Sequence, residues 1–200
     1  MLKETNQTTI NLSNYSSLYN ILIVKNNFWR QLNEMLDFSF VFEELKEKYS
    51  STMGRKAEEV VRMFKYLLLK GYYKLSDRGL VERTKTDLLF KYFLGYSPEE
   101  TELIDPSLLT VFRRERLSNK ENEEETSTNL LDKLIGKTVE LALEEGLIEA
   151  KNAELKSNFG YDEANATGKV GITIQGATTL FLANMKRIIK LKEEKSIENE

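Results

Sequence analysis

Few side chains in this sequence could perform acid–base or metal chemistry. Its 200 residues contain neither histidine nor cysteine, which removes imidazole bases, thiolate nucleophiles and the usual zinc ligands. Hydrolytic chemistry would therefore have to use carboxylates that hold a hard cation such as Mg²⁺. Candidates among the 32 Asp and Glu residues are Asp132, Glu140 and Glu149, and Lys156 follows Glu149 by seven positions, a spacing that is weak evidence alone. Catalysis with two metal ions needs several carboxylates that converge on the metals. Glu149 alone is therefore expected to be a solvated carboxylate, and no metal site is predicted.

A second set of side chains could bind DNA. The candidates are the basic residues of two short predicted helices: Arg78, Arg83, Lys85, Arg113, Arg114 and Arg116. Basic residues on such helices can contact phosphates and base edges. The first three fall on the second member of a helix–turn–helix-like segment, which is an outline common in DNA-binding domains. The alternative is a charged helix face packed against acidic neighbours.

Hydrophobic periodicity predicts the elements that would position these residues, and it indicates a mainly α chain. Gly71 and Gly95 are expected to end helices, whereas Asp37, the segment 75–77 and Ser107 are expected to cap helix starts. The predicted helices cover residues 27–36, 38–49, 55–70, 75–84, 88–94, 107–117, 128–145, 149–159 and 173–195, with a turn at 50–54, loops at 96–106 and 160–171, and strand-like stretches only at 20–24 and 169–174.

Two further groups of residues have simpler interpretations. Aromatic residues at helical spacing are expected to form a core rather than a platform for stacking bases. They are Phe28, Trp29, Phe38, Phe40, Phe42, Phe64 and Tyr66. The basic residues near the C-terminus are expected to form a solvent-exposed face of the last helix. They are Lys186, Arg187, Lys190 and Lys192.

Composition and charge indicate how the chain is organised. Apolar residues make up 40% and charged residues 30%, which is typical of a globular protein. Residues 55–92 hold ten Lys/Arg against five Asp/Glu, whereas residues 118–150 hold three against nine. We predict a flexible arm at 1–19, a helical domain at 20–117, an acidic linker at 118–128 and a C-terminal segment at 129–195. The apolar runs are too short to span a membrane and no signal peptide is evident, so a cytoplasmic location is expected.

Both parts of the chain resemble bacterial insertion-sequence DDE transposases. The C-terminal resemblance rests on Glu149 and Lys156 with 159–161, Gly168, 174–178 and 184–188. The N-terminal resemblance, to the InsH-type domain of the same family, runs through 37–40, 54–55, 62–70, 75–76, 81–83, 90–94, 104–107 and 109–117, with a bridging helix at 130–147. The C-terminal resemblance implies that Glu149 corresponds to the third catalytic acid and that an intact relative uses Mg²⁺. The N-terminal resemblance implies that this domain recognises the element's DNA ends.

The resemblance is interrupted just before Glu149. The family's upstream Tyr and Arg positions hold Ala142 and Glu145, and the chain runs from Leu147 into the Glu149 helix without the two strands that carry the first two aspartates. Asp132 and Glu140 lie on a predicted helix with no evident way of converging on Glu149. We therefore predict a C-terminal helical remnant of a ribonuclease-H-like domain and a transposase-derived DNA binder without catalytic activity. Its expected partners are element-end DNA and a second copy or an intact transposase. The alternatives are an oligomerising helical remnant without a DNA role, and an active transposase.

Overall fold

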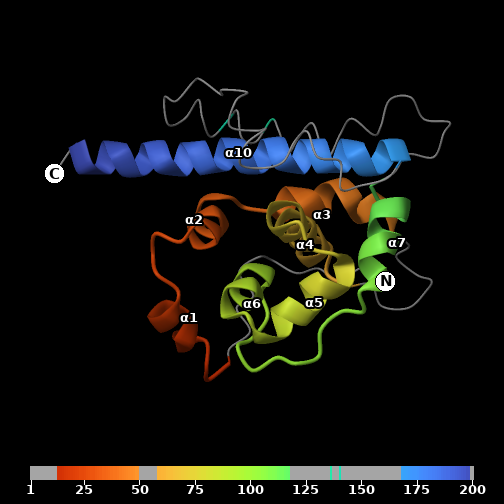
Figure 1. Cartoon of the computed structure of the whole chain (residues 1–200), viewed down its shortest axis with the longest axis horizontal. Helices are drawn as coiled ribbons and strands as arrows, with labels where there is room; N and C mark the ends of the chain where they lie inside the picture. Colours follow the sequence, from red (N-terminus) through yellow and green to blue (C-terminus); the bar gives the residue numbers. More distant parts are fainter. Residues whose placement is uncertain (1–12, 50–57, 118–135, 137–139, 141–167, 199–200) are drawn as a thin grey trace. The chain divides into compact units, whose positions relative to one another are not determined.

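The computed structural model describes residues 13–49, 58–117, 136, 140 and 168–198, and Figure 1 shows their arrangement within each part of the chain. The chain divides into two units, Met1–Arg116 and Leu117–Glu200. Helices account for the regular structure of both units, and the described ranges contain no strand. The prediction of a mainly α fold is confirmed.

The domain begins with three short helices. They are α1 (Ser17–Leu22), α2 (Phe28–Met35) and α3 (Ser39–Leu45), and a 3₁₀ turn, η1 (Lys46–Lys48), extends α3. A side chain just before α2 and another just before α3 accept backbone N–H groups of the helix starts. The Asn27 side chain accepts the Trp29 N–H at 2.9 Å, and the Asp37 carboxylate accepts the Ser39 N–H at 3.0 Å, as expected for Asp37. The strand-like interpretation of 20–24 is wrong because α1 occupies most of it. Tyr19 is buried, although it lies in the range assigned to a flexible arm.

Helix α4 (Val60–Tyr73) is the central helix of the domain, and it packs against α3, α5, α6 and α7. Nine of its fourteen residues are buried, so hydrophobic burial on nearly all sides stabilises it. The expected end at Gly71 is wrong, because the helix continues for two residues. Lys74 then ends it in the left-handed conformation, with φ of 52°. Residues 58 and 59 precede the helix and are not helical, so it also begins later than predicted.

Three short helices complete the domain: α5 (Asp77–Thr86), α6 (Leu88–Leu94) and α7 (Ser107–Glu115). Ser76 caps α5 by accepting the Gly79 N–H at 3.1 Å, and Gly95 ends α6 with φ of 75°, both as predicted. Ser107 does not cap α7. Its own N–H donates to the Asp105 carboxylate at 2.8 Å, so Asp105 serves the helix start instead.

Aromatic side chains fill the space between α2, α4 and α6. Trp29 is 2% exposed, its ring centroid lies 4.6 Å from that of Phe93, and its Nε1 donates to the Tyr73 hydroxyl at 3.0 Å. Of the seven aromatic residues expected in the core, Trp29, Phe38, Phe64 and Tyr66 are buried and the other three are partly buried. The prediction of an aromatic core is confirmed.

The second unit is described mainly by one helix, α10 (Gly168–Glu198). It includes the stretch 169–174, so the strand-like interpretation there is wrong, and so is the loop predicted to reach Gly171. Along α10 the buried residues recur at helical spacing, from Ile174 through Phe181 and Met185 to Ile189. Gly136 and Glu140 are helical as well. The predicted turn at 50–54, the acidic linker and the 149–159 helix lie outside the described residues.

Candidate nucleic-acid interface

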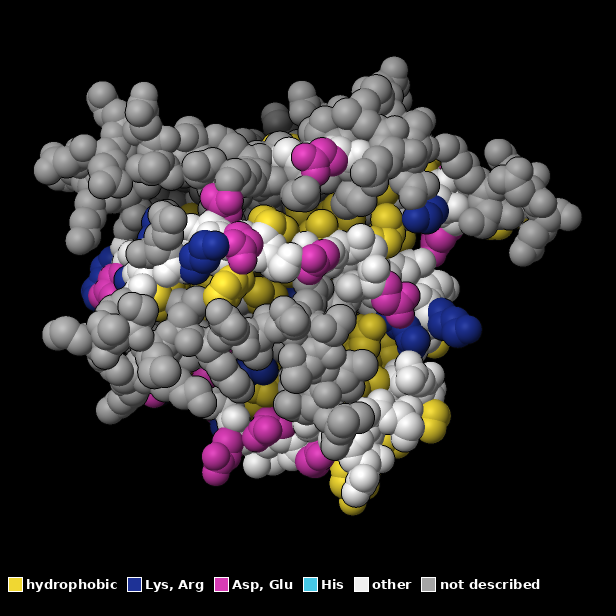
Figure 2. All heavy atoms as spheres, turned by 180° about the vertical axis from the view of Figure 1, so that it is seen from behind, with side chains coloured by type: hydrophobic (Ala, Val, Ile, Leu, Met, Phe, Trp, Pro, Cys, Tyr) yellow, Lys and Arg dark blue, Asp and Glu magenta, His cyan; other side chains and the backbone are white. Residues whose placement is uncertain are grey.

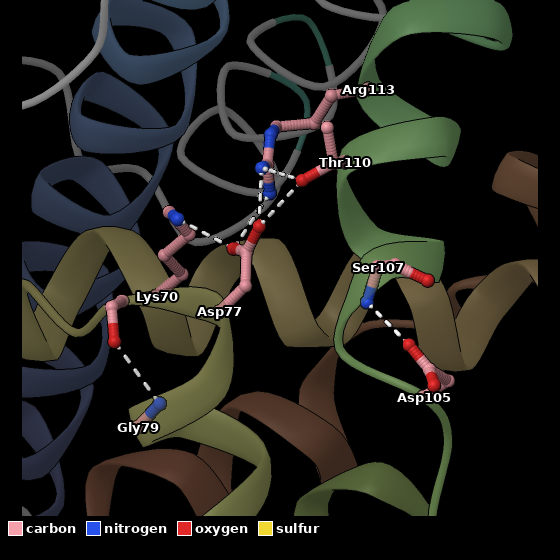
Figure 3. A network of polar contacts seen from close by, with 8 residues as sticks. Lys70, Asp77, Gly79, Asp105, Ser107, Thr110 and Arg113 are labelled. Atoms are coloured by element: carbon pink, nitrogen blue, oxygen red, sulfur yellow. Dashed lines mark hydrogen bonds and ion pairs between the residues drawn. The ribbon is translucent and has the colours of Figure 1, made fainter.

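One carboxylate, Asp77 at the start of α5, connects three helices of the N-terminal domain (Figure 3). Arg113 of α7 donates two parallel hydrogen bonds to it, from Nη1 to Oδ1 at 2.9 Å and from Nη2 to Oδ2 at 2.6 Å. The Nζ of Lys70 on α4 lies 2.5 Å from Oδ1, and the Thr110 hydroxyl donates to Oδ2 at 2.9 Å. Because the Asp77 side chain is only 16% exposed, this cluster fixes α4, α5 and α7 against one another.

The same contacts determine the charge of Asp77. Burial by itself would raise the pKa of the carboxyl, but the hydrogen bonds from Arg113 and Lys70, together with their positive charges, outweigh burial and lower the pKa from 3.8 to about 2. The carboxylate is therefore ionised at neutral pH. Arg113 was predicted to contact DNA, and in this structure its guanidinium is occupied by Asp77.

Two more of the six candidate cations have internal partners. The Arg83 Nε donates to Asp87 at 3.1 Å, and its Cζ lies 4.6 Å from the ring centroids of both Tyr73 and Phe90. Arg116 donates from Nη1 to the Lys48 carbonyl at 2.6 Å, and the Lys48 Nζ donates back to the Arg116 carbonyl at 3.0 Å. These contacts join α5 to α6 and α7 to η1, so both arginines stabilise the domain.

The other three candidate cations are exposed, and so is Arg83, whose side chain is 44% exposed despite its internal partners. Arg78 on α5 has no hydrogen bond or ion pair among the described residues. Lys85 lies on the same helix, 45% exposed, and pairs with Glu82 at 2.8 Å. Since residues 78, 82 and 85 are spaced by four and three positions, they share one face of α5. Arg114 on α7 is 71% exposed and pairs with its neighbour Glu115 at 3.0 Å.

Two lysines whose role could not be seen in the sequence are buried in the domain. The Lys65 Nζ donates to the Asn33 side chain at 2.7 Å and lies 4.9 Å from the Phe38 ring centroid. Burial lowers the pKa of this amine from 10.5 to about 8. The Lys91 Nζ donates to the Pro98 carbonyl at 2.7 Å. Part of the positive charge of residues 55–92 thus lies inside the domain rather than on its surface.

The described surface carries charges of both signs. On the face shown in Figure 2, Lys and Arg side chains are interspersed with Asp and Glu rather than gathered into one basic area. Ion pairs account for part of this mixing, as Lys46 pairs with Glu43. A DNA contact through this domain would therefore depend on a few individual cations rather than on a broad positive field.

Of the candidate catalytic residues, only Glu140 lies within the described part of the chain. Glu149, Lys156 and Asp132 lie outside the described residues, and Glu140 is an exposed helical residue. No group of three acidic side chains that could hold a metal ion occurs within the part of the chain that the structure describes. The roles assigned to Glu149 and Lys156 therefore stay predictions.

Comparison with known proteins agrees with the transposase resemblance at the level of the family. Residues 16–115, which are half of the chain, match the family model described as Transposase domain (DUF772). The chain belongs to this transposase domain family. The match covers α1 through α7 and so includes the Asp77 cluster and all the exposed cations of α5 and α7. Neither curated proteins nor solved structures give a significant match. Among the described helices, none is long and apolar enough to cross a membrane.

Proposed function

We propose that this protein binds the DNA ends of a mobile element through the exposed cations of α5 and α7. The observation that carries the proposal is the position of Arg78 and Arg114. Each directly follows one member of the Asp77–Arg113 pair, and both are exposed. Because the pair holds α5 against α7, the two cations are presented from neighbouring points of different helices. Membership of the transposase domain family supports DNA as the ligand.

The six candidate cations then have two different roles. Arg83, Arg113 and Arg116 hold the helices in place, and Arg78, Lys85 and Arg114 meet the DNA. Each phosphate contact releases counterions, so affinity falls with salt in proportion to the number of contacts. With two to three contacts, the logarithm of the association constant should fall with the logarithm of salt concentration with a slope of roughly −2 to −3.

A binding titration tests this assignment. Duplexes taken from the DNA that flanks the gene are compared with scrambled duplexes at low salt. The double variant Arg78→Ala and Arg114→Ala should weaken binding at least tenfold and reduce the salt slope by about two. The matched control is Arg187→Ala with Lys190→Ala, which removes two exposed cations from α10. The proposal fails if the two double variants bind equally well, or if the end sequence is not preferred over the scrambled one.

The proposal also holds that the protein does not cut or join DNA by itself. Its support is the sequence before Glu149, where the resemblance requires two aspartate-bearing strands and the chain continues from Leu147 without them. Two-metal chemistry needs several convergent carboxylates. Incubating element ends with Mg²⁺ or Mn²⁺ should give no nicking above a Glu149→Ala control, and the protein should lower transposition by an intact relative in trans. Nicking that disappears in Glu149→Ala would contradict this part.

A further inference from the structure

The N-terminal domain exposes an apolar surface on and around α1. Its members are more than half exposed: Tyr15 at 57%, Ile21 at 73%, Leu22 at 57% and Val24 at 64%. Tyr15 and Leu22 are seven positions apart, with the turn before α1 in helical hydrogen bonding, so they share one face with Ile21 beside them. Hydrophobic side chains (yellow) protrude at the lower right of Figure 2. We call these four residues the α1 patch.

The α1 patch is held firmly in place on the domain. The buried Tyr19 hydroxyl donates to the Tyr96 carbonyl at 2.8 Å. Arg30 of α2 donates to the Ile23 carbonyl at 2.8 Å and to the Asn20 side chain at 3.1 Å. These bonds hold the middle and the C-terminal end of a six-residue helix that would not be stable alone. Its apolar side chains are therefore displayed in a defined arrangement, which keeps the entropic cost of binding a partner low.

The α1 patch carries no charge of its own. Residues 13–24 contain no Asp, Glu, Lys or Arg, although charged residues make up 30% of the chain. The exposed polar side chains around the patch are Asn14, Ser17 and Asn20, and each can both donate and accept hydrogen bonds. The charges beside it are Arg30, whose side chain is only 11% exposed and bonds to Asn20 and the Ile23 carbonyl, and at its edges Lys25 and Glu99, which accepts a hydrogen bond from Ser13.

We propose that the α1 patch is a self-association surface whose partner is the same patch on a second copy of this chain. In a two-fold symmetric contact each side chain faces a copy of the same surface. A charged residue close to the symmetry axis would then meet its own copy, whereas apolar residues, serines and asparagines pair well with themselves. The composition of residues 13–24 meets this requirement, and a charged partner surface would lose its hydration here without gaining a counter-charge.

The size of the patch indicates how strong this contact is. If a tyrosine offers about 200 Å² and the aliphatic side chains somewhat less, the four exposed fractions add up to roughly 500 Å² for each copy. Two copies would bury about 1,000 Å², which is at the lower limit for specific interfaces. We therefore expect a weak dimer that forms at about 200 µM and dissociates at about 5 µM.

Sedimentation velocity of the full chain over this concentration range tests the proposal. Ile21→Glu should raise the dimer dissociation constant at least tenfold, because it places two carboxylates against each other across the symmetry axis. The matched control is Ile197→Glu, since Ile197 is 74% exposed but lies on α10. A chain that stays monomeric at 200 µM, or a dimer weakened equally by both substitutions, would overturn the proposal.

Disulfide crosslinking gives a second readout that does not depend on how well Ile21→Glu folds. The chain has no cysteine, so a single introduced thiol can pair only with its copy. Under mild oxidation Ile21→Cys should yield at least tenfold more covalent dimer than Ile197→Cys at equal concentration. The yield should fall when excess cysteine-free chain is added as a competitor. Equal yields from the two variants would mean random collision and would rule out the α1 patch.

Discussion

Lysine and arginine are used differently in the N-terminal domain and on α10. In the domain, Arg113 binds Asp77 with its whole guanidinium and Lys65 is 5% exposed beneath aromatic rings. On α10, three of the four basic residues predicted to form an exposed face, Arg187, Lys190 and Lys192, are exposed, whereas Lys186 is partly buried. The Lys190–Glu194 pair there is 3.7 Å long, with side chains 64% and 51% exposed.

This difference indicates where charged side chains contribute to stability. A desolvated, bidentate ion pair has few alternative partners, so removing one member leaves an unpaired charge in a low-dielectric site. An exposed pair exchanges readily with water and contributes little. The N-terminal helices have six to fourteen residues, and short helices depend on such tertiary contacts. The four predictions below test this contrast, from the largest expected change in stability, at Asp77, to the smallest, on α10.

The largest loss of stability should come from Asp77→Ala. This substitution leaves Lys70 and Arg113 without their shared carboxylate, so we expect the free energy of unfolding of the domain to fall by about 3 kcal/mol. Urea denaturation followed by circular dichroism measures this change. Asp105→Ala serves as the control, since it removes an exposed helix-capping carboxylate, and it should cost about 1 kcal/mol.

The Asp77 cluster also predicts that the stability of the domain falls at acidic pH. The pKa of Asp77 is about 2 in the folded protein against 3.8 as its ordinary value, so the ionised carboxylate contributes its full stabilisation above about pH 4. The contribution is lost as pH falls from there through 2. Asp77→Ala should flatten this part of the stability profile. An unchanged profile would mean that Asp77 is not the carboxylate responsible.

The second effect concerns the buried amine of Lys65. Its pKa is about 8 when folded and 10.5 ordinarily, so between these values the unfolded chain binds more protons and stability rises with pH. We expect a gain of roughly 2 kcal/mol from pH 7.5 to 9.5. Lys65→Met should abolish the gain. The window ends near pH 10, where the raised pKa values of Tyr66 and Tyr96 begin to favour unfolding. A rise that persists in Lys65→Met would assign it to another group.

The smallest effect should come from the exposed pair on α10. A double-mutant cycle of Lys190→Ala and Glu194→Ala should give a coupling free energy of at most about 0.5 kcal/mol. Raising the salt concentration to about 1 M should remove it. A coupling as large as that between Asp77 and Arg113, measured in a parallel cycle, would erase the contrast between the two regions.

The sequence predicted helix type and most helix starts because these depend on local residues. Ser76 and Gly95 act as expected, since a hydroxyl at a helix start and a glycine at a helix end satisfy backbone groups in their own turn. Gly71 did not end α4, because Tyr72 and Tyr73 beyond it pack against Trp29 and extend the helix. Tertiary contacts of this kind are not encoded in a local pattern.

The candidate site was predictable as a list of cations but not as an arrangement. Arg113 and Asp77 are 36 positions apart, and nothing in either segment indicates that they meet. Arg83, Arg113 and Arg114 look alike in the sequence, since all are basic residues of short helices. Only their surroundings distinguish an arginine over two aromatic rings from one that is 71% exposed. At 169–174, β-branched residues favoured a strand, but this propensity is weak and the helix prevailed.

The position of the single tryptophan has a practical consequence. The chain has one Trp, and Trp29 lies at 2% exposure with its indole N–H bonded to Tyr73 and its ring near Phe93. Its fluorescence emission should therefore be blue-shifted in the folded state and shift to the red when α2 separates from α4 and α6. The molecule thus contains an optical probe confined to its N-terminal unit, and comparing this signal with circular dichroism would show whether α10 melts in the same step.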